Sequence, residues 1–151
     1  MTAARVTVAV VLTLALGATL EAPAEPAKQI TALTPQDIRW VTPPYYTDGR
    51  QRAYLRGDSS KGGDWLDRVK IPVGARVRAH THPDDEIVTV IEGTWCLGIG
   101  DRFDERTLKA YPAGSFIVVP GGVPHFVATK DGPVIVQLSG QGLFRTEYVE
   151  Q

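Results

Sequence analysis

Short stretches in which apolar and polar residues alternate recur along the chain from residue 52 onward, separated by turns rich in glycine and proline. The alternation is regular from Trp65 to Ile71, and 87–91 is β-branched almost throughout, as is typical of strands. Further strands are predicted at 52–56, 95–99, 115–119, 126–129 and 134–139. Many short strands with a turn every roughly eight to twelve residues predict an all-β antiparallel sandwich or barrel.

Helix is predicted only as isolated turns. Residues 33–38 fit one turn, with Thr34 as the N-cap and Pro35 in the first helical position. A second turn is predicted within 104–110. Both segments are too short to cover a sheet, so the predicted core lies between sheets.

The first 24 residues follow a different pattern. Arg5 precedes an apolar run from Val6 to Leu16, and the segment closes on Ala22-Pro23-Ala24. A positive start, an apolar core and a small-residue ending are typical of a secretory signal peptide. The apolar run is shorter than the roughly 20 residues that a membrane-spanning helix needs. We therefore expect cleavage of 1–24, a mature chain that begins at Glu25 without a stable membrane anchor, and a periplasmic or secreted location.

The remaining chain reads as an arm followed by one domain. Residues 25–50 are proline-rich and weakly patterned, and 51–151 hold the predicted strands. The formal net charge is −1, with no basic stripe, which argues against a nucleic-acid partner. The single cysteine, Cys96, lies in an apolar strand and is expected to be a buried thiol. The arm and the edges of a short-stranded sandwich predict a homodimer.

All three histidines of the chain fall in two segments. His80, His82 and Glu86 form an H-x-H-x-x-x-E pattern, and His125 follows a second segment rich in glycine and proline. Strand residues two apart point to the same side, so His80 and His82 share a face, and Glu86 has the same parity. Burying three imidazoles and a carboxylate together is costly unless something pairs them. The pattern therefore indicates a divalent transition metal, which could be Fe, Mn, Ni, Cu or Zn.

These segments resemble the two sequence motifs of the cupin superfamily. The residues that match the first motif, at every spacing, are Gly74, His80, His82, Glu86 and Gly93, and those that match the second are Gly114, Pro120, Gly122 and His125. The resemblance implies a double-stranded β-helix, the cupin jelly-roll barrel. It also implies that His80, His82, Glu86 and His125 are the metal ligands. The family's second motif usually ends in asparagine, where this chain has Thr129.

For three histidines and one glutamate, the resemblance suggests a metal-dependent enzyme that oxidises a small organic substrate in the manner of a dioxygenase. A redox-neutral lyase or isomerase and a non-catalytic metal or small-ligand binding protein remain alternatives, because this fold hosts many chemistries. Catalytic residues are not assignable from the sequence. Tyr54, Trp95 and Gln137 are candidate substrate-lining residues by parity and position, and Asp84 and Asp85 are expected in a solvated loop.

Overall fold

The computed structural model describes residues 29–150. It divides into two units, 1–32 and 33–151. Of the first unit only 29–32 are described, and they have no regular secondary structure. The predicted signal peptide, residues 1–24, lies outside the described residues. No helix in the described part of the chain is long and apolar enough to cross a membrane.

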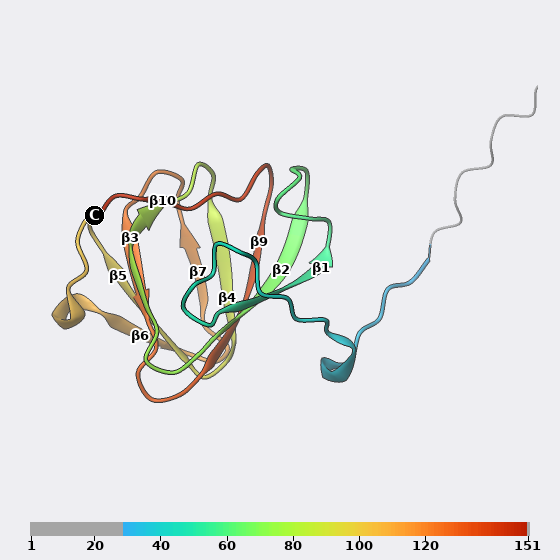
Figure 1. The fold of residues 1–151 in the computed structure, drawn as a ribbon, viewed down its shortest axis with the longest axis horizontal. Helices are drawn as coiled ribbons and strands as arrows, with labels where there is room; N and C mark the ends of the chain where they lie inside the picture. Colours follow the sequence, from blue (N-terminus) through green and yellow to red (C-terminus); the bar gives the residue numbers. More distant parts are fainter. Residues whose placement is uncertain (1–28, 151) are drawn as a thin grey trace, which may run out of the picture. The chain divides into compact units, whose positions relative to one another are not determined.

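The second unit is built from ten strands and two single 3-10 turns within 33–150 (Figure 1). In chain order these elements are η1 (Pro35–Asp37), β1 (Gln51–Arg56), β2 (Trp65–Ile71), β3 (Arg76–Thr81), β4 (Glu86–Glu92), β5 (Thr94–Ile99), η2 (Glu105–Thr107), β6 (Lys109–Pro112), β7 (Phe116–Val119), β8 (His125–Ala128), β9 (Val134–Gly140) and β10 (Glu147–Tyr148).

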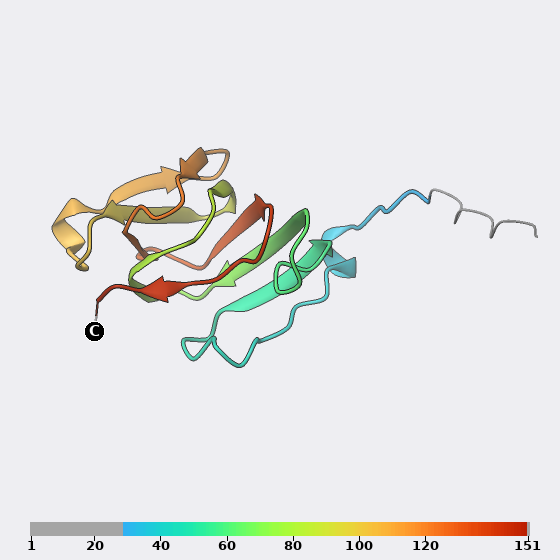
Figure 2. The ribbon, with the colours of Figure 1, turned by 90° about the horizontal axis from the view of Figure 1, so that it is seen from above.

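The strands form two five-stranded sheets with the orders β1-β2-β9-β4-β7 and β10-β3-β8-β5-β6. Every pairing between these strands is antiparallel. The sheets face each other across the core, as the two views show (Figures 1 and 2). This arrangement confirms the predicted all-β jelly roll with antiparallel sheets.

The core follows from the alternation along each strand. In β2 the residues Trp65, Asp67, Val69 and Ile71 are buried while their neighbours are half-buried, as the sequence pattern predicts. β4 and β9 alternate in the same way and contribute mostly valine to the core. Cys96 is buried and free, in agreement with the prediction.

Two short strands depart from the sequence prediction. Only Glu105–Thr107 of the predicted turn at 104–110 is helical, and Asp104 accepts the capping hydrogen bond from the Arg106 N–H at 3.0 Å. The following residues extend into β6, which pairs with β5. β10 contains two residues, too few for any periodic pattern, and it pairs with β3.

From residue 33 onward the arm belongs to the same unit as the barrel. Val41 and Arg52 exchange two backbone hydrogen bonds of 2.8 Å, and Tyr46 is buried in the core cluster. The Lys70 ammonium lies 4.5 Å from the centre of the Trp40 ring. The arm therefore contributes a side chain to the barrel interior, while the predicted boundary at residue 51 stays a prediction.

Candidate metal centre

A β-bulge directs the first two histidines into the barrel. β3 pairs with β8 in a register that shifts between Val77 and His80. Strict alternation would place Val77 and His80 on opposite faces, yet both are buried. An extra residue in one strand reverses the side on which later residues fall. His80 and, two residues on, His82 thus face the interior together, as their parity predicts.

The turn before β8 places the third histidine beside them. Pro120 to Val123 forms a turn in which Gly122 has a φ of 75°, a conformation that favours glycine. The Gly122 N–H donates to the His82 carbonyl at 2.8 Å, so the two histidine segments are tied together. His125, the first residue of β8, then lies directly opposite His80 in the ladder.

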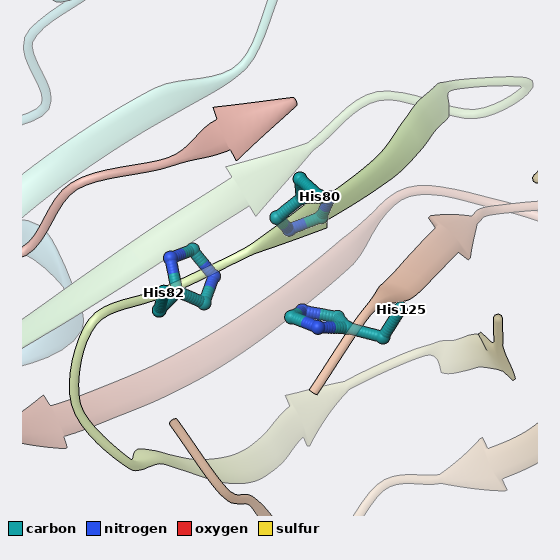
Figure 3. Close-up of side chains that lie close together, drawn as sticks. All are labelled: His80, His82 and His125. Atoms are coloured by element: carbon teal, nitrogen blue, oxygen red, sulfur yellow. The ribbon is translucent and has the colours of Figure 1, made fainter. Parts of the chain in front are cut away.

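The three imidazole rings converge (Figure 3). One nitrogen from each of His80, His82 and His125 lies within 4.8 Å of those of the other two, and all three residues are buried. The ring centres of His80 and His125 are 4.3 Å apart, and that of His82 lies 5.0 Å and 5.2 Å from them. The chain thus brings together three histidines that its sequence separates by up to 45 positions.

Backbone carbonyls fix the tautomer of each ring. The Nδ1 atoms of His80, His82 and His125 lie 2.7, 2.7 and 3.0 Å from the carbonyl oxygens of residues 78, 145 and 123. A carbonyl oxygen only accepts, so each Nδ1 carries a proton, and in the neutral form of each ring the lone pair is on Nε2. Second-shell hydrogen bonds of this kind orient metal-binding histidines. The three Nε2 atoms are therefore prepared as donors to one ligand.

The Glu86 carboxylate completes the polar cluster. β4 begins at Glu86, which shares the inward face with Val88 and Val90. Its oxygens lie 3.7 Å from Nε2 of His82 and 3.6 Å from Nε2 of His125. These distances exceed a hydrogen bond, and Nε2 of His125 is buried without a partner among the described residues.

Burial sets the charge of this cluster. It lowers the pKa of His80 to about 3, helped by the neighbouring His125, and it lowers the pKa of His82 against the opposing effect of Glu86. Burial alone would raise the pKa of Glu86, but contact with His125 and His82 brings it below its usual value. At neutral pH the cluster therefore presents neutral imidazoles at His80 and His82 beside an ionised carboxylate.

Comparison with known proteins agrees with this geometry. Residues 67–139, which contain all four residues of the cluster, match the family model described as "Cupin domain". The chain belongs to the cupin superfamily. A germin-like protein of Arabidopsis thaliana, subfamily 3 member 3, is 33% identical over 72 residues, which are 46% of this chain and 34% of that protein. The chain therefore matches about a third of this curated relative's length.

Solved structures share the cupin fold. The polyketide cyclase RemF from Streptomyces resistomycificus superposes with a TM-score of 0.66 at 16% identity, covering 82% of this chain and 87% of the cyclase. The DMSP lyase DddQ from Ruegeria pomeroyi DSS-3 superposes with a TM-score of 0.53 at 22% identity, covering 74% and 55% of the two chains. At these identities the likeness establishes the fold alone.

The donor set of this cupin fits a metal ion. Nitrogen atoms of three buried imidazoles converge, and Nε2 of His125 has no hydrogen-bond partner within 29–150; such an arrangement is costly unless a cation occupies its centre. Nitrogen donors beside a carboxylate suit iron, manganese, nickel, copper or zinc. The three histidines could therefore hold an ion, with Glu86 placed to join them.

The three predicted substrate-lining residues fall in different places. Trp95 lines the cavity that contains the histidines. Tyr54 lies on edge strand β1 and is exposed, and Gln137 accepts a hydrogen bond from Nε of Arg68 at 3.2 Å. Tyr54 and Gln137 are absent from the cavity lining, and a substrate contact by Trp95 stays a prediction.

Four further cavity residues do not stand out in the sequence. Tyr46 and Arg50 come from the arm, Arg52 from β1 and Phe144 from the segment before β10. Strand alternation could have placed Arg52 on the inward face. Because arginine is seldom buried without a partner, its sequence position alone suggests an exposed side chain. The other three precede or follow the strands, where no periodicity indicates direction.

Proposed function

We propose that this cupin is a metal-dependent enzyme that acts on a small organic molecule, with dioxygenase-type oxidation as its reaction. The ligands would be His80, His82, His125 and Glu86. One observation carries the proposal: three buried histidines, each with its Nδ1 bonded to a backbone carbonyl, converge in a cavity.

In this proposal a bound metal ion would supply charge stabilisation and a place for the substrate's oxygen atoms. The protein's own contribution is position. The carbonyl contacts hold the imidazoles in one orientation, so little reorganisation is needed when substrate binds. Glu86, ionised and 3.6 Å from His125, is near enough to accept a proton from a substrate held at the histidines.

A redox-neutral reaction is the second candidate. Two proteins with the same fold are named for reactions of other classes, a polyketide cyclase and a DMSP lyase. A histidine-bound metal can act as a Lewis acid on a carbonyl or enolate without any change of oxidation state. A non-catalytic binding protein would use the same cavity and release its ligand unchanged.

Metal analysis tests the site. The purified protein should contain about one transition-metal ion per chain, and His82→Ala should lose most of it, because two imidazoles and a carboxylate form an incomplete set. Asp84→Asn is the matched control, since Asp84 is exposed two residues from His82 and should leave the metal content unchanged. Full occupancy in His82→Ala would refute the metal centre.

Oxygen uptake distinguishes the reactions. Protein loaded with iron, manganese, nickel or copper would be incubated with small carboxylic acids and phenols in an oxygen electrode, with product analysis by mass spectrometry. Oxygen consumption matched by product supports oxidation. Product without oxygen consumption supports the lyase or isomerase alternative, and a ligand recovered unchanged supports the binding protein.

We further propose that the protein is exported, on the basis of the signal-peptide pattern in residues 1–24. Expression in a bacterial host with a secretory pathway, followed by N-terminal sequencing of the periplasmic protein, should give a chain that begins at Glu25. Recovery of the chain with Met1 intact in the membrane fraction would contradict this.

A further inference from the structure

The histidine cavity continues into a second hollow. The inner cavity has a volume of about 50 Å³, and the adjoining outer one, here called the vestibule, has about 370 Å³. Tyr46, Arg50, Phe144 and Thr146 line both. Because a cavity needs about 10–15 Å³ on this scale for one water, the inner cavity admits only a few atoms of a ligand. The body of any larger molecule must lie in the vestibule.

A buried arginine lines the inner cavity. Arg52 is 1% exposed, and its Nη1 donates to Ser59 Oγ at 2.8 Å and to Asp67 Oδ2 at 3.0 Å. Its Nη2 donates to the Tyr46 hydroxyl at 3.1 Å. Nε is buried with no partner among residues 29–150. Three of its five N–H donors are engaged among these residues, so two, including the one on Nε, are left for an acceptor that enters the cavity.

A second arginine stands where the two hollows meet. The Arg50 guanidinium lies 4.3 Å from the centre of the Tyr46 ring, and the Arg52 guanidinium lies 5.8 Å from the same centre. Nε of Arg50 donates to Asp48 at 2.9 Å, and the side chain is 13% exposed. The carboxylates of Asp48 and Asp67 balance the two cations. Of the acids, Glu86 lines the inner cavity at the histidine end, and Glu147 lines the vestibule together with Arg145.

Aromatic rings surround the path outward. Tyr45, Tyr46, Phe144 and Tyr148 line the vestibule. Phe144 lies between the Arg52 guanidinium, 4.5 Å from its ring centre, and the His82 ring, 4.4 Å away and inclined by 30°. Aromatic side chains in this number favour a planar apolar group over a hydrated one in the vestibule.

We propose that the ligand of this site is a small carboxylate with a flat apolar body. Its carboxylate is bound by Arg50 and Arg52 where the inner cavity meets the vestibule, and its body lies among the four aromatic residues of the vestibule. A carboxylate matches the planar donor fork of arginine. The carboxylate end of the molecule then lies nearest the histidines. This inference rests on the proposed function for which end of the ligand reacts. The anion site itself depends only on Arg50 and Arg52.

Benzoate and benzamide are the probes, because they share size and shape and differ in charge. Isothermal titration of metal-free and zinc-loaded protein should show benzoate binding at least about tenfold more tightly than benzamide, the ratio expected from charge-assisted hydrogen bonds. Arg50→Gln should weaken this preference, because Arg52 alone then binds the carboxylate, while zinc content stays unchanged. Arg50 is chosen because loss of Arg52 would leave Asp67 buried without its counter-ion.

Arg76→Gln is the matched control, since Arg76 is an exposed arginine on β3 that pairs with Glu105 away from the cavity. It should retain the benzoate preference. Equal affinity for the two probes, an unchanged preference in Arg50→Gln, or tighter binding of inorganic phosphate than of benzoate would overturn the inference. If the wild-type protein binds zinc but shows no benzoate preference, the anion site is refuted and the metal centre is not. If the wild-type protein prefers benzoate but binds no zinc, the metal centre alone is refuted.

Discussion

Thr129 makes side-chain hydrogen bonds at the position where the cupin motif usually has asparagine. It stands where the resemblance leads us to expect asparagine, and it is 2% exposed. Its Oγ1 accepts from the Ala75 N–H at 3.0 Å and donates to the Pro72 carbonyl at 2.5 Å, while its backbone pairs with Gly74 and Ala75. Thr129 thus fixes the turn that leads into β3, the strand that carries His80.

Thr129→Val should therefore destabilise the fold. Valine keeps the side-chain volume but leaves the Ala75 N–H and the Pro72 carbonyl without their partner, at a cost of about 1–3 kcal/mol. Urea unfolding should show a lower midpoint with an unchanged slope. Thr89→Val is the control, because Thr89 is half-buried on β4 and should change stability by less than about 0.5 kcal/mol. Equal midpoints for the two variants would contradict the role of Thr129.

At the residue scale, the histidines could be identified from the sequence because they are few and because parity relates His80 to His82. Parity could not reveal the bulge after Val77, which depends on pairing with β8. Nor could it reveal Arg50 or Tyr46, whose direction is set by packing of the arm against the barrel. The cluster of donors was thus predictable, whereas the cavity around it was not.

At the scale of elements, strands with a buried face were predictable because one buried side imposes a period of two. β2 is the clearest case, with bounds that match the predicted 65–71. β6 and β10 escaped prediction because they lie at opposite edges of one sheet and bury no continuous face. Their formation depends on the partner strand and not on their own pattern.

The central strand β8 depends on a glycine in its neighbour β5. Gly98 is paired with Phe126, which is 1% exposed and packs against Phe103 with ring centres 5.1 Å apart. A Cβ on Gly98 would overlap the Phe126 ring. Phe126 follows His125 directly, so the space at Gly98 determines how β8 can present a metal ligand.

Gly98→Ala should consequently reduce both stability and metal affinity. Overpacking of this kind costs about 1–3 kcal/mol, and the shift of β8 should displace His125. Thermal unfolding and a competitive zinc titration measure the two effects. Gly132→Ala is the control, because a Cβ there meets no atom within 4 Å and neither glycine has a positive φ. A Gly98→Ala variant with unaltered zinc affinity would show that β8 tolerates the larger residue.

For the whole molecule, the question is what covers the sheet edges. The sheets end at β1 and β7 and at β10 and β6. On β7, Phe116 is 66% and Val118 46% exposed. Both residues pair with half-buried positions of β4, Phe116 with Thr89 and Val118 with Ile87, so the apolar surface extends from Val118 to Ile87. An exposed apolar edge strand is a common place for contact between copies of a chain.

We therefore expect a homodimer, and light scattering at micromolar concentration should give about twice the monomer mass. Phe116→Lys should shift the protein toward monomer, because a charged residue on an edge strand opposes strand-to-strand contact. Ile99→Lys is the matched control: Ile99 is 73% exposed, but it lies at the end of β5 in the other sheet and should leave the mass unchanged. All four proposed metal ligands come from one chain, so monomeric Phe116→Lys should retain its metal. A wild-type monomer, or equal masses for the two variants, would exclude this edge as the interface.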